Sequence, residues 1–269
     1  MRPIFVFGIG RSGTSALLKS LGEHPEFDKA SAVGEAPFIS SFFHFLKDFE
    51  ETSPNASYNT KNYRKGQIER QEIFRGMIEK LHTSGSAVDK KYWTSKISLN
   101  MENYRFFEEI FPDFGVIYII RNGIEVVNSA RKFTGFMDRS FSDLCRRWQQ
   151  SLARSAFLER SPRCALIRHE DLISNPSDTM SGAFIHLGVT ENPGPGNFID
   201  STIFNSSFSA SSSNVEGNSA QTLAHRRVEA WESWSREERQ TFLDVCGEEM
   251  RRHAFAIPQQ EAWRQSGRG

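Results

Sequence analysis

The sequence has few cysteines, and their spacing excludes two common kinds of site. Only three are present in 269 residues, Cys145, Cys164 and Cys246, and no two form a Cys-x-x-Cys pair. This number and spacing disfavour a disulfide framework and a zinc cluster, and they predict three small buried side chains in a reducing compartment. The seven histidines show no His-x-His or His-x-x-x-His pairing. No acidic cluster resembles a magnesium site, so we expect no bound metal.

Long apolar runs and net charge are also lacking. No stretch approaches the roughly 18 apolar residues of a transmembrane helix, and residues 1–3 lead directly into a strand-like segment without the apolar core of a signal peptide. Lysine plus arginine equals aspartate plus glutamate at 33 each. A neutral chain offers no general field for nucleic acid or an acidic membrane surface. We therefore expect a cytoplasmic protein that binds neither, and that places positive charge locally for any anion it binds.

Apolar runs of strand length alternate with stretches of helical periodicity. The predicted strands are residues 4–9, 116–120 and 165–167, and the predicted helices are residues 14–21, 124–131, 141–157, 179–187 and 228–255. This alternation predicts an α/β fold with a mainly parallel, P-loop-type sheet flanked by helices, formed by residues 1–269 as a single domain. Residues 192–221 are rich in Ser, Asn, Gly and Pro and predict a long loop or lid, and residues 256–269 a tail.

The first strand is followed by a glycine-rich turn, Gly8-Ile9-Gly10-Arg11-Ser12-Gly13-Thr14-Ser15, that opens a helix. Gly8 and Gly13 have the spacing of a nucleotide phosphate loop, in which backbone N–H groups at a helix N-terminus bind phosphate. Thr14 stands where a nucleoside triphosphatase carries its lysine, which disfavours ATP or GTP. Arg11 could instead bind an oxyanion with its guanidinium, and Ser12, Thr14 and Ser15 could add hydroxyl donors. The alternative is an ordinary glycine-rich turn.

Residues 5–15, followed by Leu21-Gly22-Glu23-His24-Pro25, resemble the 5′-phosphosulfate loop of the sulfotransferases that use 3′-phosphoadenosine 5′-phosphosulfate (PAPS). The resemblance is nearest to the branch that holds the tyrosylprotein, carbohydrate and many bacterial enzymes. It implies that PAPS is the co-substrate and that the acceptor is a small molecule, a carbohydrate or a peptide.

Further segments strengthen the resemblance. Arg121 closes a strand and is followed eight residues later by Ser129, as in the motif that binds the 3′-phosphate of PAPS. Residues 167–172 are similar to the family's Arg-Tyr-Glu-Asp-Leu segment, with His169 at the tyrosine position. Residues 227–231 resemble the segment where a basic residue and a tryptophan close over the nucleotide. This similarity assigns Arg226 or Arg227 to the 3′-phosphate.

The resemblance implies that a sulfuryl group moves from PAPS to an acceptor hydroxyl or amine by in-line displacement. Arg11 then lies at the phosphosulfate. Glu35 occupies the place of the family's catalytic base, with His24 as a competitor that also fits helix termination and packing. Lys96 would be the cation at the bridging oxygen, its alternative being a surface lysine. Two rival interpretations remain open: a kinase-like nucleotide enzyme on a P-loop fold, and a nucleotide-binding module without catalysis.

Overall fold

The computed structural model describes residues 1–28, 89–97, 101–201 and 220–258, together with residues 72, 73, 75–77 and 80. Its sheet contains β1 (Arg2–Phe7), β2 (Tyr92–Lys96), β3 (Gly115–Ile120) and β4 (Cys164–Arg168). The strands are all parallel and lie in the order β2-β1-β3-β4. This confirms the predicted parallel α/β fold. The three predicted strands are present, and β2, which was not predicted, is added at one edge of the sheet.

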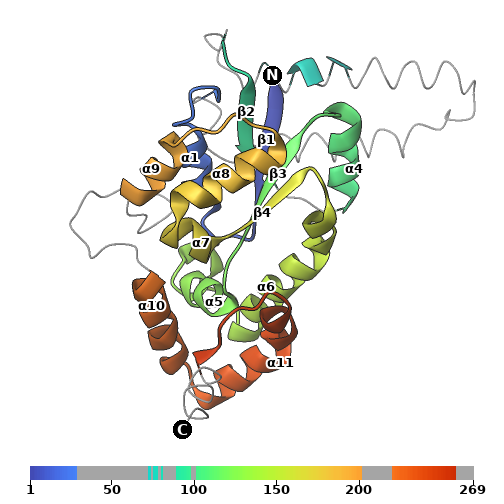
Figure 1. Ribbon diagram of the computed structural model, residues 1–269. Coiled ribbons are helices and arrows are strands. Elements are labelled where there is room, and N and C mark those ends of the chain that lie inside the picture. Colours follow the sequence, from blue (N-terminus) through green and yellow to red (C-terminus); the bar gives the residue numbers. More distant parts are fainter. Residues whose placement is uncertain are drawn as a thin grey trace, which may run out of the picture.

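Both faces of the sheet are largely buried, as expected for the apolar runs of β1 and β3 at its centre. On one face Ile4, Val6 and Ile117 pack with α1 (Thr14–Leu21), α8 (Pro176–Leu187) and α9 (Gly194–Ser201). In Figure 1 these helices lie on the side of the sheet opposite α4 (Met101–Ile110) and α6 (Phe141–Ser155).

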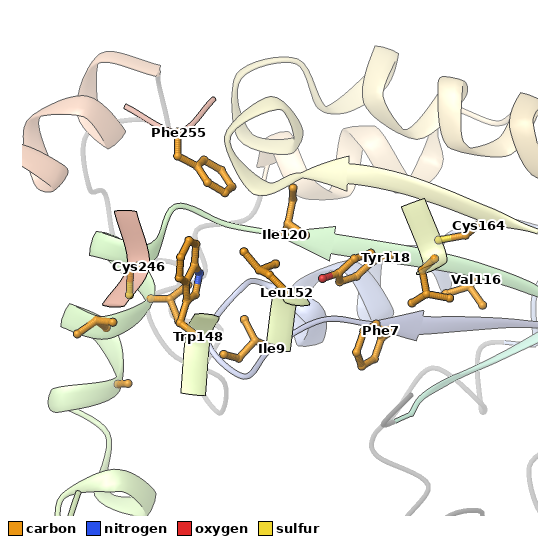
Figure 2. Close-up of a cluster of buried hydrophobic side chains, with 14 of the residues drawn as sticks. Phe7, Ile9, Val116, Tyr118, Ile120, Trp148, Leu152, Cys164, Cys246 and Phe255 are labelled. Carbon is orange, nitrogen blue, oxygen red and sulfur yellow. The ribbon is translucent and has the colours of Figure 1, made fainter. Parts of the chain in front are cut away.

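The second face supplies the larger core. Phe7 of β1 and Tyr118 of β3 belong to the same cluster as Trp148 and Leu152 of α6 (Figure 2). The same cluster takes in α4, α5 (Gly123–Arg131) and α11 (Arg236–Arg252). Short helical segments, η2 (Thr134–Phe136), η3 (Ala156–Arg160) and α7 (His169–Ser174), complete the connections. The three cysteines are free and buried, as their spacing predicted.

Residues 192–221 are not a loop throughout, which corrects the prediction from their composition. Residues Gly194–Ser201 form α9, with Pro195 in the first turn, where a missing N–H is tolerated. The glycines serve close packing: a Cβ on Gly196 would lie 2.8 Å from the Cα of Ser177, and one on Gly194 would lie 2.5 Å from the carbonyl of Glu23. Residues 202–219, which hold the rest of the predicted lid, lie outside the described residues.

The C-terminal part also differs from its prediction as one helix over residues 228–255. It forms two helices, α10 (Ala220–Glu232) and α11, because Ser235 begins a new N-terminus. The Ser235 hydroxyl accepts from the N–H of Glu238, whose carboxylate accepts from the N–H of Ser235, forming a capping box. The predicted tail begins later than residue 256, because Ile257 is buried and the carbonyl of Ala256 accepts from Asn122 Nδ2.

None of the described helices is both long and apolar enough to cross a membrane.

The capping box should contribute measurably to the stability of α11. We expect Ser235→Ala to lower the free energy of unfolding by about 1 kcal/mol, because it leaves the N–H of Glu238 without its acceptor. Ser235→Thr keeps the hydroxyl and should lose much less. Urea unfolding of the two variants beside the unaltered protein measures the difference, and equal stabilities for Ala and Thr would contradict the assignment.

Candidate functional site

The candidate site lies at the carboxyl edge of the sheet, where three adjacent strands end. The glycine-rich loop follows β1, Arg121 follows β3, and His169 begins α7 directly after β4. Because these strands are parallel neighbours, their C-terminal ends meet at the same edge. Segments from widely separated parts of the sequence therefore converge here.

The loop after β1 has the backbone geometry of an anion-binding turn. Gly13 is the N-cap of α1, with φ +96°, and it has no side chain to cap this helix. No described side chain caps the first N–H groups of α1, and such groups at a helix N-terminus can bind an anion. Gly8 is held against β3, since a Cβ there would lie 2.5 Å from the carbonyl oxygen of Ile119. The Ser12 hydroxyl donates to the carbonyl of Ile9 at 2.6 Å. Ser12 therefore braces the loop, which differs from its predicted role as a ligand donor.

Arg11 joins the loop to the second motif. It adopts φ +80°, a left-handed conformation that is uncommon for a side chain of this size. Its Nε donates to the Oγ of Ser129 at 3.0 Å, and its guanidinium lies 4.8 Å from the ring centroid of Phe133. Arg121 in turn donates from Nη1 to the carbonyl of Arg11 at 3.0 Å. The structure thus brings Arg11, Arg121 and Ser129 together, although they come from two motifs more than 100 residues apart.

The site concentrates positive charge. The pKa of Arg11 is lowered from its ordinary value, first by burial and then by repulsion from Arg121. Two arginines near each other favour an anion between or beside them. Ser129 accepts a hydrogen bond from Arg11, so its own hydroxyl proton is left to donate. These features support binding of a multiply charged anion.

Three further residues complete the described site: His169, which the resemblance places at the family's tyrosine position, and Glu125 and Glu170, to which the sequence analysis gave no role. The ring of His169 packs against Gly13, where a Cβ would lie 2.7 Å from its Cδ2. Burial, and secondarily Arg121, holds the pKa of His169 far below its ordinary value, so the ring is neutral. Glu125 forms an ion pair with Arg121. Glu170 accepts from the N–H of Asn122 at 2.9 Å, and burial raises the pKa of this carboxyl.

The other predicted site residues are placed as follows. Thr14 is buried in the first turn of α1, and Ser15 beside it is half-buried. Lys96 ends β2 and lies opposite Val6 of β1. Arg226 is exposed on α10, whereas the Nε of Arg227 is buried and makes no hydrogen bond to the described part of the chain. Helix α10 contacts α5 and α7, which brings it to the edge of the site. Glu35 lies outside the described residues.

His24 has a structural role, and this weakens it as an alternative base. Its Nδ1 accepts from the N–H of Glu26 at 3.1 Å, and its Nε2 lies 2.8 Å from the carbonyl of Thr190. The ring stands edge-on between Phe27 and Phe184. Both ring nitrogens are therefore occupied, as expected for a residue that terminates a helix and packs. Trp231, expected near the nucleotide, is buried in the core.

Among the described residues, no group of three or more His, Cys, Asp or Glu side chains could hold a metal ion.

Comparison with known proteins identifies the class to which this fold and site belong. Residues 3–193 match the model of the Sulfotransferase family, so the chain belongs to that family. It is 23% identical over 244 residues to a protein-tyrosine sulfotransferase of Drosophila melanogaster, a match that covers 86% of this chain and 46% of the relative. The chain therefore spans about half the length of that protein.

Solved structures share the fold. A sulfotransferase domain from the olefin synthase of Synechococcus PCC 7002 is similar with a TM-score of 0.54 and 14% identity, over 96% of each chain. Mouse sulfotransferase SULT7A1, solved in complex with PAP, is similar with a TM-score of 0.54 and 14% identity, over 93% of this chain and 85% of that one. At this level of identity the similarity concerns the fold.

Two glycines of the loop offer a matched test of its geometry. Gly8→Ala should lower the free energy of unfolding by about 1–3 kcal/mol, because the added Cβ would meet a backbone oxygen that cannot easily move. Gly10→Ala should be nearly neutral, since the closest atoms to a Cβ there are 3.8 and 3.9 Å away, at the ends of the Arg147 and Phe136 side chains. Thermal or urea unfolding distinguishes them. Similar losses in both variants would contradict the close contact between Gly8 and β3.

Proposed function

We propose that this chain transfers a sulfuryl group from PAPS to an acceptor hydroxyl or amine. The observation that carries the proposal is the contact between the two motifs: Arg121 donates to the carbonyl of Arg11, whose side chain donates to Ser129. A ligand with two separate anionic groups fits such a site better than a ligand with one. Family membership supports the same reaction class.

Each anionic group of the donor has its own set of residues in the proposal. The backbone N–H groups at the start of α1, with Arg11, Thr14 and Ser15, would hold the 5′-phosphosulfate. Arg121 and Ser129 would hold the 3′-phosphate. Arg226 or Arg227 would add a second cation from α10. The latter is favoured by its buried Nε, which has no hydrogen-bond partner among the described residues.

The chemistry then needs a base and a cation beside the leaving oxygen. We assign the base to Glu35, which would take the proton from the acceptor as its oxygen or nitrogen attacks sulfur. Lys96 would stabilise the charge that develops on the bridging oxygen. Its place supports this role, because β2 lies directly beside β1, whose end leads into the phosphate loop. The residues invoked carry the reaction without a metal ion.

We also propose a class of acceptor and a cellular location. The relative from Drosophila is named for protein tyrosine, and this supports a hydroxyl acceptor on a peptide, with small molecules and carbohydrates as the other classes. Three free, buried cysteines are compatible with the cytoplasmic location that we propose.

Ligand-induced stabilisation separates this function from that of a kinase-like enzyme. Adenosine 3′,5′-bisphosphate at about 100 times its Kd should stabilise the protein by about 2.7 kcal/mol without magnesium, which raises Tm by several degrees. ATP with magnesium should have little effect. The opposite pattern would favour a kinase. Binding of the bisphosphate without transfer of labelled sulfate from PAPS to any component of a cell extract would favour a binding module.

The two arginines should respond differently to truncation. Arg121→Ala should weaken binding of the bisphosphate by about 1.5–3 kcal/mol and Ser129→Ala by a smaller amount, with turnover at saturating PAPS largely retained. Arg11→Ala should lower both affinity and turnover, because charge redistributes at the phosphosulfate during transfer. Calorimetry and steady-state kinetics measure the two effects, and a change confined to affinity would remove Arg11 from the transition state.

Glu35→Gln should abolish most turnover while leaving nucleotide affinity nearly unchanged. The substitution keeps the size of the side chain and removes its ability to take a proton, a loss of roughly 10²–10⁴-fold in rate. Lys96→Met should also lower turnover through loss of charge at the bridging oxygen. Both are measured as initial rates at saturating PAPS. Full activity of Glu35→Gln at neutral pH would eliminate Glu35 as the base and return attention to His169 or His24.

A further inference from the structure

Glu125 holds the side chain of Arg121 in a single orientation. One oxygen, Oε2, accepts from Arg121 Nε at 3.0 Å, and the two residues are four positions apart across the start of α5. The Glu125 side chain is only 4% exposed, so this pair is screened little by solvent. Glu125 also lies in the first turn of α5, where the helix dipole favours a negative charge. Its other oxygen, Oε1, is buried and has no hydrogen-bond partner among the described residues. The ion pair with Arg121 therefore offsets part of the cost of burying this carboxylate.

Arg121 is fixed from several directions at once. Its Nη1 donates to the carbonyl of Arg11 at 3.0 Å, and its own carbonyl accepts from the indole N–H of Trp148 at 3.0 Å. With Nε taken by Glu125, two of its three guanidinium nitrogens are occupied. Within the described residues, Nη2 has no hydrogen-bond partner. The arrangement therefore presents Nη2, and the second N–H of Nη1, to a ligand.

The turn that carries Arg121 is braced in the same way. The N–H of Asn122 donates to Glu170 of α7, and the Oδ1 of Asn122 accepts from the N–H of Ile124 to cap α5. The Nδ2 of Asn122 reaches the carbonyl of Ala256 in the C-terminal segment. These contacts restrain the backbone of Arg121, so its remaining conformational freedom is in the side-chain torsions. Among the described residues, Glu125 is the one whose side chain hydrogen-bonds to the guanidinium and restricts those torsions.

We propose that Glu125 is a positioning residue: its carboxylate oxygen orients the Arg121 guanidinium toward the 3′-phosphate of the nucleotide. This inference rests on the proposed function, because it assumes that the ligand of Arg121 is the 3′-phosphate of PAPS. Fixing a donor before the ligand arrives removes an ordering cost from binding. Glu125 acts through Arg121 and touches no reacting atom.

A competing effect has the opposite sign. A carboxylate close to the phosphate repels it, so the negative charge of Glu125 by itself weakens nucleotide binding. The two effects can be separated by substitutions. Glu125→Gln removes the charge but keeps an oxygen acceptor, Glu125→Met removes both at similar length, and Glu125→Asp keeps the charge but withdraws it by one methylene group.

The experiment compares two ligands by calorimetry: adenosine 3′,5′-bisphosphate and adenosine 5′-monophosphate, which lacks the 3′-phosphate. We expect Glu125→Met to raise the Kd of the bisphosphate about tenfold, the cost of losing a charged hydrogen bond, with the Kd of the monophosphate unchanged. Glu125→Asp should weaken bisphosphate binding in the same selective way, and Glu125→Gln should stay near the unaltered protein. Glu248→Met, at an exposed position of α11, is the control for substituting a glutamate by methionine.

A double-mutant cycle shows whether the effect passes through Arg121. In the Arg121→Ala background, Glu125→Met should cause no further loss of bisphosphate affinity, because the side chain that it orients is absent. Additive losses would overturn the proposal.

The remaining outcomes are also decisive. Equal weakening of both ligands would make Glu125 a general structural support, and tighter bisphosphate binding by the Gln and Met variants would show that its charge dominates. Failure of the unaltered protein to bind the bisphosphate would defeat the proposed function itself. Normal binding that is insensitive to Glu125 would defeat only this inference.

Discussion

The described site depends on one hydrogen bond, from the guanidinium of Arg121 to the main-chain carbonyl of Arg11. It joins the loop after β1 to the end of β3, and it can form only because these strands are parallel neighbours. Arg11 adopts a left-handed conformation that costs about 1 kcal/mol for a residue with a side chain. The bond to its carbonyl and the bond from its Nε to Ser129 offset that cost. The strained backbone of Arg11 is therefore stabilised by two hydrogen bonds, to Arg121 and to Ser129, that belong to the site itself.

Two arginines side by side would repel each other, and the structure balances this in two different ways. Arg121 is paired with Glu125, whereas Arg11 lies over the ring of Phe133. An aromatic face attracts a cation without neutralising it, so this contact leaves the guanidinium of Arg11 positively charged. Burial, and then repulsion from Arg121, lowers the pKa of Arg11. A bound anion would reduce the repulsion between the two arginines. Arginine in this loop therefore suits a site that binds an anion without the lysine and the magnesium ion that a triphosphatase uses.

Much of this architecture could be predicted from local sequence patterns, and the rest depends on tertiary contacts. Strands β1, β3 and β4 and the glycine-rich loop were predictable because apolar runs and a glycine spacing define them, whereas the edge strand β2 (Tyr-Trp-Thr-Ser-Lys) lacks such a run. Helix α9 was missed because its glycines, which indicate a loop by composition, instead permit close approach to α8. The break before Ser235 has a local signal, Ser followed three residues later by Glu, which is the pattern of a capping box. The family resemblance assigned Arg11 and Arg121 to the same nucleotide, but nothing local shows that Arg121 contacts Arg11, that Glu125 pairs with Arg121 or that Ser12 turns its hydroxyl inward.

The groups at the carboxyl edge also determine how the site should respond to pH. His169 is the histidine that packs on the phosphate loop, and burial together with Arg121 keeps it neutral well below its ordinary pKa. It therefore adds no charge near neutral pH, and protonating it would place a third cation beside two arginines. Arginine itself stays protonated throughout this range. The positive charge that would hold the nucleotide is thus constant near neutrality. In the proposed mechanism, we expect a pH dependence of turnover in that range, measured at saturating PAPS, to arise from the group that accepts the proton, Glu35.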